Sequence, residues 1–314
     1  MPCRLRLRFI GEVGMARIAF IGLGNMGGGM AANLAKAGHD VRAFDLSAEA
    51  LERAVSAGCL AAGTAVEAVE RAEAVVTMLP AGTHVESIYA DAAIPGAAPG
   101  AVLIDCSTID VATARRVAGA AVAKGLLAVD APVSGGIAAA AAGTLTFMVG
   151  GSQQAFAQAE PVLAAMGKAV IHAGPSGAGQ GAKICNNMLL GATMVATCEA
   201  FALAEALGLD LQTFYDISSV SSGQSWSMTS YCPVARVGPD TPADHDYAGG
   251  FAAALMLKDL RLAMQAAEAS GASTPMGERA TELYERLVSG GQGGRDFSII
   301  GRTLRQDAEG RSAS

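Results

Sequence analysis

The sequence predicts an α/β fold, in which an N-terminal Rossmann-type, doubly wound parallel sheet is followed by an all-α C-terminal domain. Three observations predict it. Short apolar runs alternate with small-residue helical patterns in the first half, a glycine-rich turn follows the first run, and long helical patterns fill the second half. The alternating strand and helix patterns give way to long helical patterns at Gly177–Asn187. We therefore expect a sheet domain over residues 15–178 and a helical domain over residues 179–314.

Composition excludes several classes of function. The 314 residues are 51% hydrophobic, which is enough to bury the cores of two domains. The net charge of −7 and the absence of a basic block argue against nucleic acid and anionic membrane as partners. The six cysteines and four histidines are scattered, without metal-ligand spacing. This pattern predicts reduced thiols, a cytoplasmic location and no metal site.

Two segments could direct the chain to a membrane or an organelle. Residues 1–14 are basic, and we expect a disordered extension before an effective start at Met15. The alternative is a presequence for the mitochondrial matrix, because such presequences are basic and amphipathic. The apolar run Met188–Leu207 has the length of a membrane span. Because Glu199 and Glu205 interrupt it, we expect a helix buried within its own protein.

The first strand pattern, Arg17–Ile21, ends directly in a glycine-rich turn that opens a helical pattern. Gly22 permits a tight turn, Gly24 lets backbone approach a pyrophosphate, and Gly27 lets the helix pack close to the sheet. The helix N-terminus then offers free N–H groups to the phosphates. This strand–turn–helix context, more than the glycines themselves, predicts a dinucleotide site. Its residues are Gly22, Leu23, Gly24, Asn25, Met26 and Gly27.

Asp45 ends the second strand pattern and predicts NAD in preference to NADP. A carboxylate at this place accepts hydrogen bonds from the ribose hydroxyls and repels a 2′-phosphate. Leu46 and Ser47 follow it, so no arginine stands there to bind that phosphate. Arg53, on the next helical pattern, keeps NADP open as the less favoured alternative.

Later strand patterns end in Leu79-Pro80 and in Ser107-Thr108. Ligands of a doubly wound sheet lie beyond the carboxyl ends of its strands, which places both pairs beside the nucleotide. Taken alone, each pair is equally well explained as a strand-end turn. The same is true of Ser134-Gly135-Gly136. Its uncovered N–H groups fit a substrate carboxylate, and a plain turn into the alanine-rich segment that follows fits equally well.

Lys183 and Asn187 are spaced i and i+4 in an apolar helical pattern, so both project from one face of the predicted helix. Such groups are costly to bury without a polar partner, and our hypothesis is that this partner is the substrate. On a later helical pattern, Lys258 and Asp259 are adjacent, which by itself favours a solvated pair. Trp226 lies in a polar segment that is either a loop over a site or a connection.

Four motifs occur together and in order: IAFIGLGNMGGGMAANL at 18–34, DAPVSGG at 130–136, GAGQGAKICNN at 177–187 and FAAALMLKDL at 251–260. On these motifs the chain resembles the 3-hydroxyisobutyrate dehydrogenase family of β-hydroxyacid dehydrogenases. The similarity extends from about Met15 to the DFS segment at 296–298. The SSGQSW segment supports the narrower match to 3-hydroxyisobutyrate dehydrogenases themselves.

The resemblance implies roles for individual residues. Lys183 matches the family's catalytic acid/base, and Asn187 matches a residue that orients the substrate. The positions implied to bind the substrate are Ser134, Gly135, Gly136, Trp226, Lys258 and Asp259. Those implied to contact the cofactor, beyond the glycine-rich turn and Asp45, are Leu79, Pro80, His84, Thr108 and Lys258.

The implied reaction is the NAD-dependent oxidation of 3-hydroxyisobutyrate to methylmalonate semialdehyde, a step of valine catabolism. Lys183 must be neutral to accept the hydroxyl proton, so we expect burial and nearby positive charge to lower its pKa. The alternatives are another short β-hydroxyacid dehydrogenase, a tartronate or succinic semialdehyde reductase, an imine reductase and a non-catalytic nucleotide-binding protein. The last two classes usually lack the lysine. The apolar helical half also predicts a homodimer or homotetramer.

Overall fold

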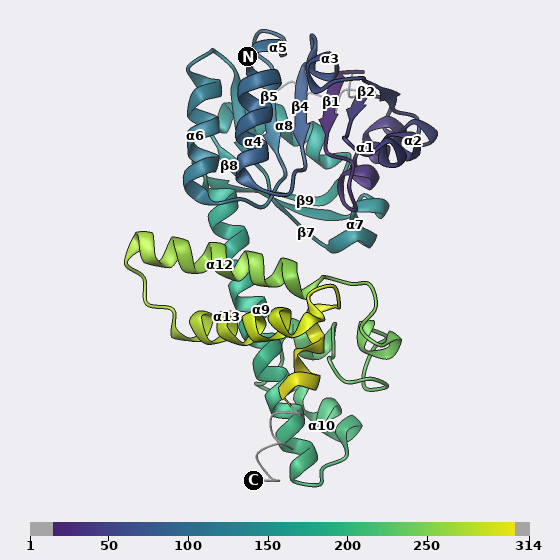
Figure 1. Ribbon diagram of the computed structural model, residues 1–314, viewed down its shortest axis with the longest axis vertical. Coiled ribbons are helices and arrows are strands. Elements are labelled where there is room, and N and C mark those ends of the chain that lie inside the picture. Colours follow the sequence, from purple (N-terminus) through teal and green to yellow (C-terminus); the bar gives the residue numbers. More distant parts are fainter. Residues whose placement is uncertain (1–14, 305–314) are drawn as a thin grey trace, which may run out of the picture. The chain divides into compact units, whose positions relative to one another are not determined.

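The structure, a computed structural model, describes residues 15–304 (Figure 1). It divides into two compact units. Unit 1 contains the chain up to Ser107 together with Ala112–Gly179, and unit 2 contains Thr108–Val111 and the chain from Gln180 onward. The extension expected over residues 1–14 lies outside the described residues.

Unit 1 is built on one nine-stranded sheet (Figure 1). Its strands are β1 (Arg17–Ile21), β2 (Asp40–Phe44), β3 (Leu60–Ala61), β4 (Ala74–Thr77), β5 (Val102–Asp105), β6 (Leu127–Asp130), β7 (Val133–Ser134), β8 (Leu145–Gly151) and β9 (Gly167–Gly174). Their order is β3-β2-β1-β4-β5-β6-β8-β7, with β9 paired to β8. From β3 to β6 every neighbouring pair is parallel, and the chain winds outward from β1 in both directions. The predicted Rossmann-type, doubly wound fold class is confirmed.

The far side of the sheet departs from the all-parallel expectation. Strand β8 pairs antiparallel with β6, with Asp130 opposite Gly150, and β7 also pairs antiparallel with β8. The reason is the link between β6 and β8, which contains only the short β7 and the helix α7 (Gly136–Ala142). This link does not recross the sheet, so β8 begins beyond the carboxyl end of β6 and runs back until its last residues pair with that end. Hydrophobic periodicity carries no information on strand direction.

The remaining helices of unit 1 connect the strands. They are α1 (Gly27–Lys36), α2 (Ala48–Ser56), α3 (Ala65–Val69), α4 (Gly82–Ile88), the π-helical segment η1 (Tyr89–Ala93), α5 (Ile94–Gly96), α6 (Val111–Val122) and α8 (Gln153–Ala164). Ser47, Thr64 and Ser152 each accept a backbone N–H bond and so cap the helix that follows. Helices α4 and α6 lie side by side, joined by an ion pair between Arg116 and Glu86 at 2.7 Å.

The core of unit 1 lies against the middle of the sheet. Every residue of β4 and of β5 is buried, as is usual for parallel strands covered on both faces. Phe20 from β1, Phe147 from β8 and Leu163 from α8 belong to the same buried cluster. This rigid centre fixes the carboxyl ends of the strands, where the predicted cofactor residues lie.

Unit 2 is helical over its described residues, apart from one isolated bridge between Ala252 and Asp296. Its helices are α9 (Ala178–Ala206), α10 (Leu211–Ser218), α11 (Trp226–Thr229), η2 (Pro242–His245), α12 (Ala253–Ser270), α13 (Pro275–Leu287), the π-helical η3 (Val288–Gln292) and η4 (Phe297–Ile299). Its main core joins α9, α12 and α13 through Met194, Leu260 and Tyr284. The expected helical second half is confirmed.

Helix α9 is less covered than the sequence suggested. It is the one helix of residues 15–304 that is long and apolar enough to cross a membrane, and 44% of its most apolar window is buried. Leu189 and Leu203 are each about three-fifths exposed, at 62% and 61%. The expectation of a helix buried within its own chain is therefore wrong for one face, because apolar side chains occupy that outward face as well as the inward one.

Candidate active site

The glycine-rich turn of unit 1 places three glycines in three different environments. A Cβ added at Gly22, whose φ is +96°, would lie 2.3 Å from the carbonyl oxygen of Met78. One added at Gly27 would lie 1.9 Å from the carbonyl oxygen of Gly22. At Gly24 an added Cβ would meet no described atom within 4 Å. Gly22 and Gly27 therefore allow the turn to close, and Gly24 leaves backbone open to a ligand.

An open cavity of about 440 Å³ lies beside this turn. It is lined by Leu23, Gly24, Asn25, Gly28, Gly29, Ala50, Arg53 and Ala54. Its position at the N-terminus of α1, where backbone N–H groups are unsatisfied, fits the phosphates of a dinucleotide. Met26 precedes α1 directly and makes no side-chain cap. The residues present therefore fit the predicted cofactor.

Asp45 lies at the end of β2, directly beside the turn. Its Oδ2 accepts a hydrogen bond from the Leu23 backbone N–H at 2.6 Å, and its Oδ1 accepts one from the Ser47 N–H at 2.8 Å. These bonds hold the carboxylate beside the glycine-rich turn and leave lone pairs for ribose hydroxyls. Arg53, the cation in the lining, forms an exposed ion pair with Glu49 at 2.6 Å. An exposed pair of this kind is weak, so Arg53 is only loosely held.

The other predicted cofactor positions of unit 1 lie at the ends of neighbouring strands. The Leu79 backbone N–H donates to the Ser107 hydroxyl at 2.8 Å, which joins the turn after β4 to the turn after β5. Pro80 is exposed in the same turn, and His84 is exposed in the first turn of α4. Thr108 belongs to unit 2, in the short segment whose Ile109 N–H donates to Gln180 Oε1 at 3.1 Å.

The predicted carboxylate-binding turn, Ser134-Gly135-Gly136, joins β7 to α7. Gly135 and Gly136 have φ of +135° and +71°, and both are exposed. The alanine-rich segment after them is a helix, which the sequence pattern did not assign. Asn33 of α1 ties this helix in place, donating to the Ala140 carbonyl at 2.8 Å. The turn is thereby fixed beside the helix that opens the dinucleotide site, because Asn33 lies on that helix.

In unit 2, four polar residues of the predicted site lie together on two packed helices. Lys183 and Asn187 are on α9, and Lys258 and Asp259 are on α12. Lys183, Asn187 and Asp259 are buried, with exposures of 8%, 2% and 5%. Asn187 Nδ2 donates to Asp259 Oδ2 at 2.5 Å. The solvated-pair interpretation of Lys258-Asp259 is therefore wrong for Asp259.

The charged groups of this cluster shift one another's pKa values. Burial lowers the pKa of Lys183, Asp259 opposes that shift, and Lys258 adds to it. Burial likewise raises the pKa of Asp259, while Lys183 and Lys258 hold it down. The expected lowering of the Lys183 pKa by burial and by Lys258 is present, and Asp259 is the group that sequence reasoning left out of this balance. A buried lysine with a lowered pKa is neutral, and so able to accept a proton, over a wider pH range than an exposed lysine.

Hydrogen bonds to both the nitrogen and the oxygen of its side-chain amide hold Asn187 in one orientation. Besides its bond to Asp259, its Oδ1 accepts a hydrogen bond from Asn186 Nδ2 at 3.0 Å. One N–H and one lone pair of the amide remain, which is enough to bind a hydroxyl. One turn further along α9, Gly191 packs against α12, where an added Cβ would lie 3.0 Å from Leu260. This glycine serves the approach of the two helices.

Trp226 lies at the start of α11 and is half exposed. It stacks on Tyr231, with ring centroids 4.7 Å apart. The Tyr231 hydroxyl donates to Asp296 Oδ2 at 2.8 Å, and Asp296 also accepts from the Phe251 N–H. Trp226 is thus connected to the DFS segment near the C-terminus of unit 2, and its role beside the substrate stays a prediction.

Sequence reasoning missed one residue that shapes the start of α9. Asp130 Oδ1 accepts the Gly177 backbone N–H at 2.6 Å. A Cβ at Gly179 would lie 2.3 Å from the Met148 carbonyl oxygen, and one at Gly150 would lie 2.7 Å from the Gly179 nitrogen. The first turn of α9 therefore lies directly on the ends of β6 and β8. The sequence signals that could have indicated this contact are Asp130 at the end of a strand pattern and the GAG sequence at 177–179 before the long helix.

Among residues 15–304, no group of three or more His, Cys, Asp or Glu lies close enough to hold a metal ion. The five cysteines described in this range are free thiols.

Comparison with known proteins identifies matches along nearly the whole described chain. Residues 17–174 match the family described as the NAD binding domain of 6-phosphogluconate dehydrogenase. Residues 177–304 match the family described as the NAD-binding domain of NADP-dependent 3-hydroxyisobutyrate dehydrogenase. These matches agree with the cavity at the glycine-rich turn in showing that the chain binds a nicotinamide dinucleotide. They do not distinguish NAD from NADP.

Individual relatives are similar over the same length. A 3-hydroxyisobutyrate dehydrogenase of Pseudomonas aeruginosa is 51% identical over 295 residues, which cover 93% of this chain and 99% of that one. An NAD-dependent L-serine dehydrogenase of the same organism is 50% identical over 288 residues, covering 91% and 97%. The solved structure of Mycobacterium tuberculosis 3-hydroxyisobutyrate dehydrogenase with L-serine has a TM-score of 0.90 at 46% identity, covering 93% of this chain and 99% of that one.

Proposed function

The chain belongs to the 3-hydroxyisobutyrate dehydrogenase family of oxidoreductases, and we propose that it oxidises 3-hydroxyisobutyrate to methylmalonate semialdehyde in valine catabolism. One observation carries the proposal of mechanism. Lys183 is buried on α9 beside Asp259 and Lys258, and burial lowers its pKa. A group of this kind can accept a proton from an alcohol at neutral pH, whereas an exposed lysine is protonated there.

The chemistry assigns one task to each group. When bound, the nicotinamide dinucleotide accepts the hydride that leaves the carbinol carbon. Neutral Lys183 accepts the hydroxyl proton at Nζ and becomes an ammonium ion, while the carbon–oxygen single bond becomes a carbonyl. Asp259 stabilises that ammonium ion, because the attraction between them favours the charged form of the lysine. Asn187, held by Asp259, binds the same hydroxyl and aligns it.

The substrate carboxylate is assigned to the Ser134-Gly135-Gly136 turn. Its glycines adopt positive φ, which points successive backbone N–H groups to one side and suits an anion. The Ser134 hydroxyl adds a donor. In this proposal Trp226 contacts the apolar part of the substrate. Lys258 provides a positive charge near both the substrate and the cofactor.

We propose NAD as the preferred cofactor. Asp45, held beside the glycine-rich turn by the N–H groups of Leu23 and Ser47, places a negative charge where NADP carries its 2′-phosphate. Arg53 lines the cavity beside this turn, and its partner Glu49 offsets its charge. Leu79, Pro80, His84 and Thr108 are assigned to the ribose and nicotinamide half of the cofactor.

L-Serine is the second candidate substrate. The observation that favours it is the similarity at 50% identity to an NAD-dependent L-serine dehydrogenase. L-Serine is itself a short β-hydroxy acid, so the same carboxylate turn and the same proton acceptor serve both reactions. The two candidates differ at C2, where one substrate carries a methyl group and the other an ammonium group.

A substrate panel tests the proposal. Reduction of NAD⁺ and NADP⁺ is followed at 340 nm with 3-hydroxyisobutyrate, 3-hydroxypropionate, glycerate and L-serine. We expect the highest kcat/KM with 3-hydroxyisobutyrate and NAD⁺. A higher kcat/KM with L-serine than with 3-hydroxyisobutyrate would show that L-serine is the preferred substrate. Absence of reduction with every β-hydroxy acid, in a preparation that binds NAD⁺, would contradict the whole proposal.

We also propose that the chain forms a homodimer or homotetramer and acts in the cytoplasm. The outward face of α9 supports self-association, because Leu189 and Leu203 are exposed along it and Leu207 is exposed directly after its end. An apolar stripe of this length on a helix is a usual site of association. Light scattering after gel filtration measures the mass. We expect Leu189→Lys to lower it, and an unchanged multimer in that variant would place the interface elsewhere.

A further inference from the structure

Asp105, at the end of β5, is a buried carboxylate that the proposed reaction does not use. It is 2% exposed. Its Oδ1 accepts the Thr77 hydroxyl at 2.8 Å and the Ser107 backbone N–H at 3.1 Å, and the Ser107 hydroxyl is bonded to the same carboxylate. Its Oδ2 has no hydrogen-bond partner among the described residues. A buried carboxylate oxygen without a donor is strongly unfavourable.

The bonds of Asp105 join the ends of two neighbouring strands. Thr77 is the last residue of β4, and Ser107 follows β5. Ser107 also accepts the Leu79 backbone N–H at 2.8 Å. The Thr77 hydroxyl donates its proton to Asp105, and Asp105 is close enough to Tyr89 to add to the effect of burial in raising the pKa of the Tyr89 hydroxyl. A continuous set of hydrogen bonds therefore runs from Leu79 through Ser107 and Asp105 to Thr77.

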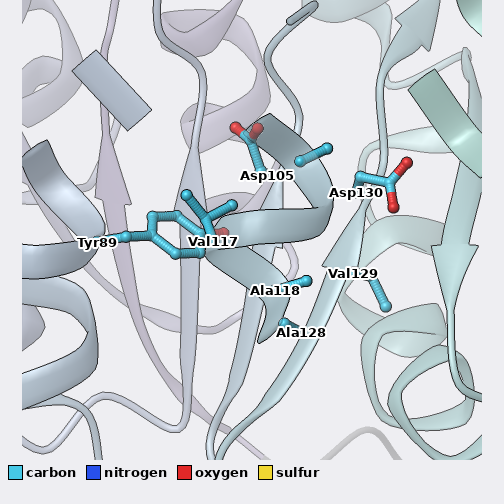
Figure 2. A pocket seen from close by; sticks show the side chains of 8 residues that line it. Tyr89, Asp105, Val117, Ala118, Ala128, Val129 and Asp130 are labelled. Carbon is cyan, nitrogen blue, oxygen red and sulfur yellow. The ribbon is translucent and has the colours of Figure 1, made fainter. Parts of the chain in front are cut away.

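A small cavity of about 10 Å³ adjoins this network (Figure 2). Three polar side chains border it, those of Tyr89, Asp105 and Asp130, and apolar side chains form the other walls (Figure 2). These are Ala114, Val117 and Ala118 from α6 and Ala128 and Val129 from β6. A cavity of this size holds about one water molecule, and a buried water needs two to four polar partners. The three polar side chains meet that requirement.

We propose that this cavity binds one water molecule, and that Asp105, completed by that water, is the positioning residue for the turns after β4 and β5. The water donates one hydrogen to Asp105 Oδ2 and the other to the Asp130 carboxylate, and it accepts a hydrogen bond from the Tyr89 hydroxyl. The turns concerned carry Leu79 and Pro80, so this inference rests on the cofactor contacts assigned above. The water is a structural ligand and takes no part in hydride transfer.

The groups around the cavity give Asp105 a distinct pH dependence. Burial raises the pKa of Asp105 to about 6, Asp130 adds slightly, and the bonds from Ser107 and Thr77 act in the opposite direction. Burial also raises the pKa of Tyr89 and of Cys106, so both stay neutral near pH 7. Because the pKa of Asp105 is higher in the folded chain than in an unfolded one, its contribution favours folding below about pH 4 and is lost as pH rises through about 6.

Asp105→Asn and Thr77→Val test the proposal, and Asp91→Asn, on the exposed side of the π-helical segment that carries Tyr89, is the control. Asparagine keeps an acceptor for Thr77 and Ser107 and removes the charge. We expect it to raise Tm relative to the wild type by several degrees at pH 8 and by about half as much at pH 5, and to change the Kd for NAD⁺ less than Thr77→Val does, because the acceptor is kept. Asp91→Asn should leave both quantities unchanged.

Thr77→Val keeps the side-chain shape and removes one donor to Asp105. We expect the Kd for NAD⁺, measured by calorimetry, to rise by about three- to tenfold, in line with the loss of one hydrogen bond to a charged group. A fall in Tm with an unchanged Kd would show a structural role only and would overturn the positioning role. A crystal structure should show one water within hydrogen-bonding distance of Asp105 Oδ2, and its absence would overturn the water site.

The two proposals fail in different ways. A wild-type chain that binds no NAD⁺ contradicts the assigned cofactor site. A wild-type chain that binds NAD⁺ with the same Kd as Thr77→Val contradicts only the positioning by Asp105.

Discussion

In unit 1 the candidate site consists mainly of backbone, whereas in unit 2 it consists of buried side-chain charges. The turn after β1 is closed at Gly22 and Gly27, where no Cβ fits, and is open at Gly24. The α9–α12 cluster instead holds Lys183, Asn187 and Asp259 away from water. This difference predicts which kind of substitution impairs each site. A single added methyl group should damage the first, and a single change of charge should damage the second.

The largest effect is expected from Lys183→Ala. Loss of the proton acceptor should lower kcat by about 10²–10⁴-fold, since that is the usual contribution of a general base. The Kd for NAD⁺ should stay unchanged, because the cofactor cavity belongs to unit 1. Lys168→Ala, which removes an exposed lysine on β9, is the control. Steady-state kinetics and calorimetry on the same preparations separate the two quantities.

Gly27→Ala should abolish measurable NAD⁺ binding and lower Tm. Its Cβ would lie 1.9 Å from the Gly22 carbonyl oxygen, so the turn must open. Gly24→Ala is the matched partner, because its Cβ meets no described atom of the chain. This variant should keep the wild-type Tm while weakening NAD⁺ binding. Equal Tm values for the two variants would show that the turn is not held as described.

Asp45→Ala should change cofactor preference by about tenfold, the value of one charge-assisted hydrogen bond. The ratio of kcat/KM for NAD⁺ to kcat/KM for NADP⁺ is the quantity to measure. Asp45→Asn keeps an acceptor for the Leu23 N–H and serves to separate loss of charge from loss of the turn. If the ratio is the same in all three proteins, Asp45 does not select the cofactor.

The smallest effects concern pH. Asp259 raises the pKa of Lys183, and Lys258 lowers it. Because Lys183 acts as a neutral base, its pKa sets the acidic limb of the kcat/KM profile. Asp259→Asn should move that limb to lower pH, and Lys258→Met should move it to higher pH. Both shifts are readable from pH profiles, and movement in the same direction for the two variants would contradict the assignment of the base.

The sequence predicted the first site better than the second for a physical reason. The glycines and Asp45 act through local backbone geometry, and their spacing along the chain determines their spacing in the fold. Asp259 reaches Asn187 across 72 residues, and only the packing of α12 on α9 brings them together. Neither periodicity nor composition reports such a contact. The resemblance placed Lys258 and Asp259 in the site, and the spacing of residues did not.

The sheet, too, was predicted only as far as local sequence patterns allow. The parallel strands up to β6 followed from alternating strand and helix patterns, while β8 was placed without its direction. Strands β3 and β7 have two residues each, too few for a recognisable pattern. The anchoring of α9 by Asp130 was also missed, because an acid at a strand end is typical of many turns. Direction, short strands and long-range polar contacts depend on tertiary packing.

The most direct test of the central claim is chemical rescue of Lys183→Ala. The central claim is that the buried amine of unit 2 accepts the hydroxyl proton. Reduction of NAD⁺ by this variant is measured with 3-hydroxyisobutyrate and increasing methylamine at several pH values. We predict a rate that rises in proportion to the free base of methylamine, with no such rise in Lys168→Ala. Turnover of Lys183→Ala at the wild-type rate, or a rate independent of free amine at every pH, would contradict the claim.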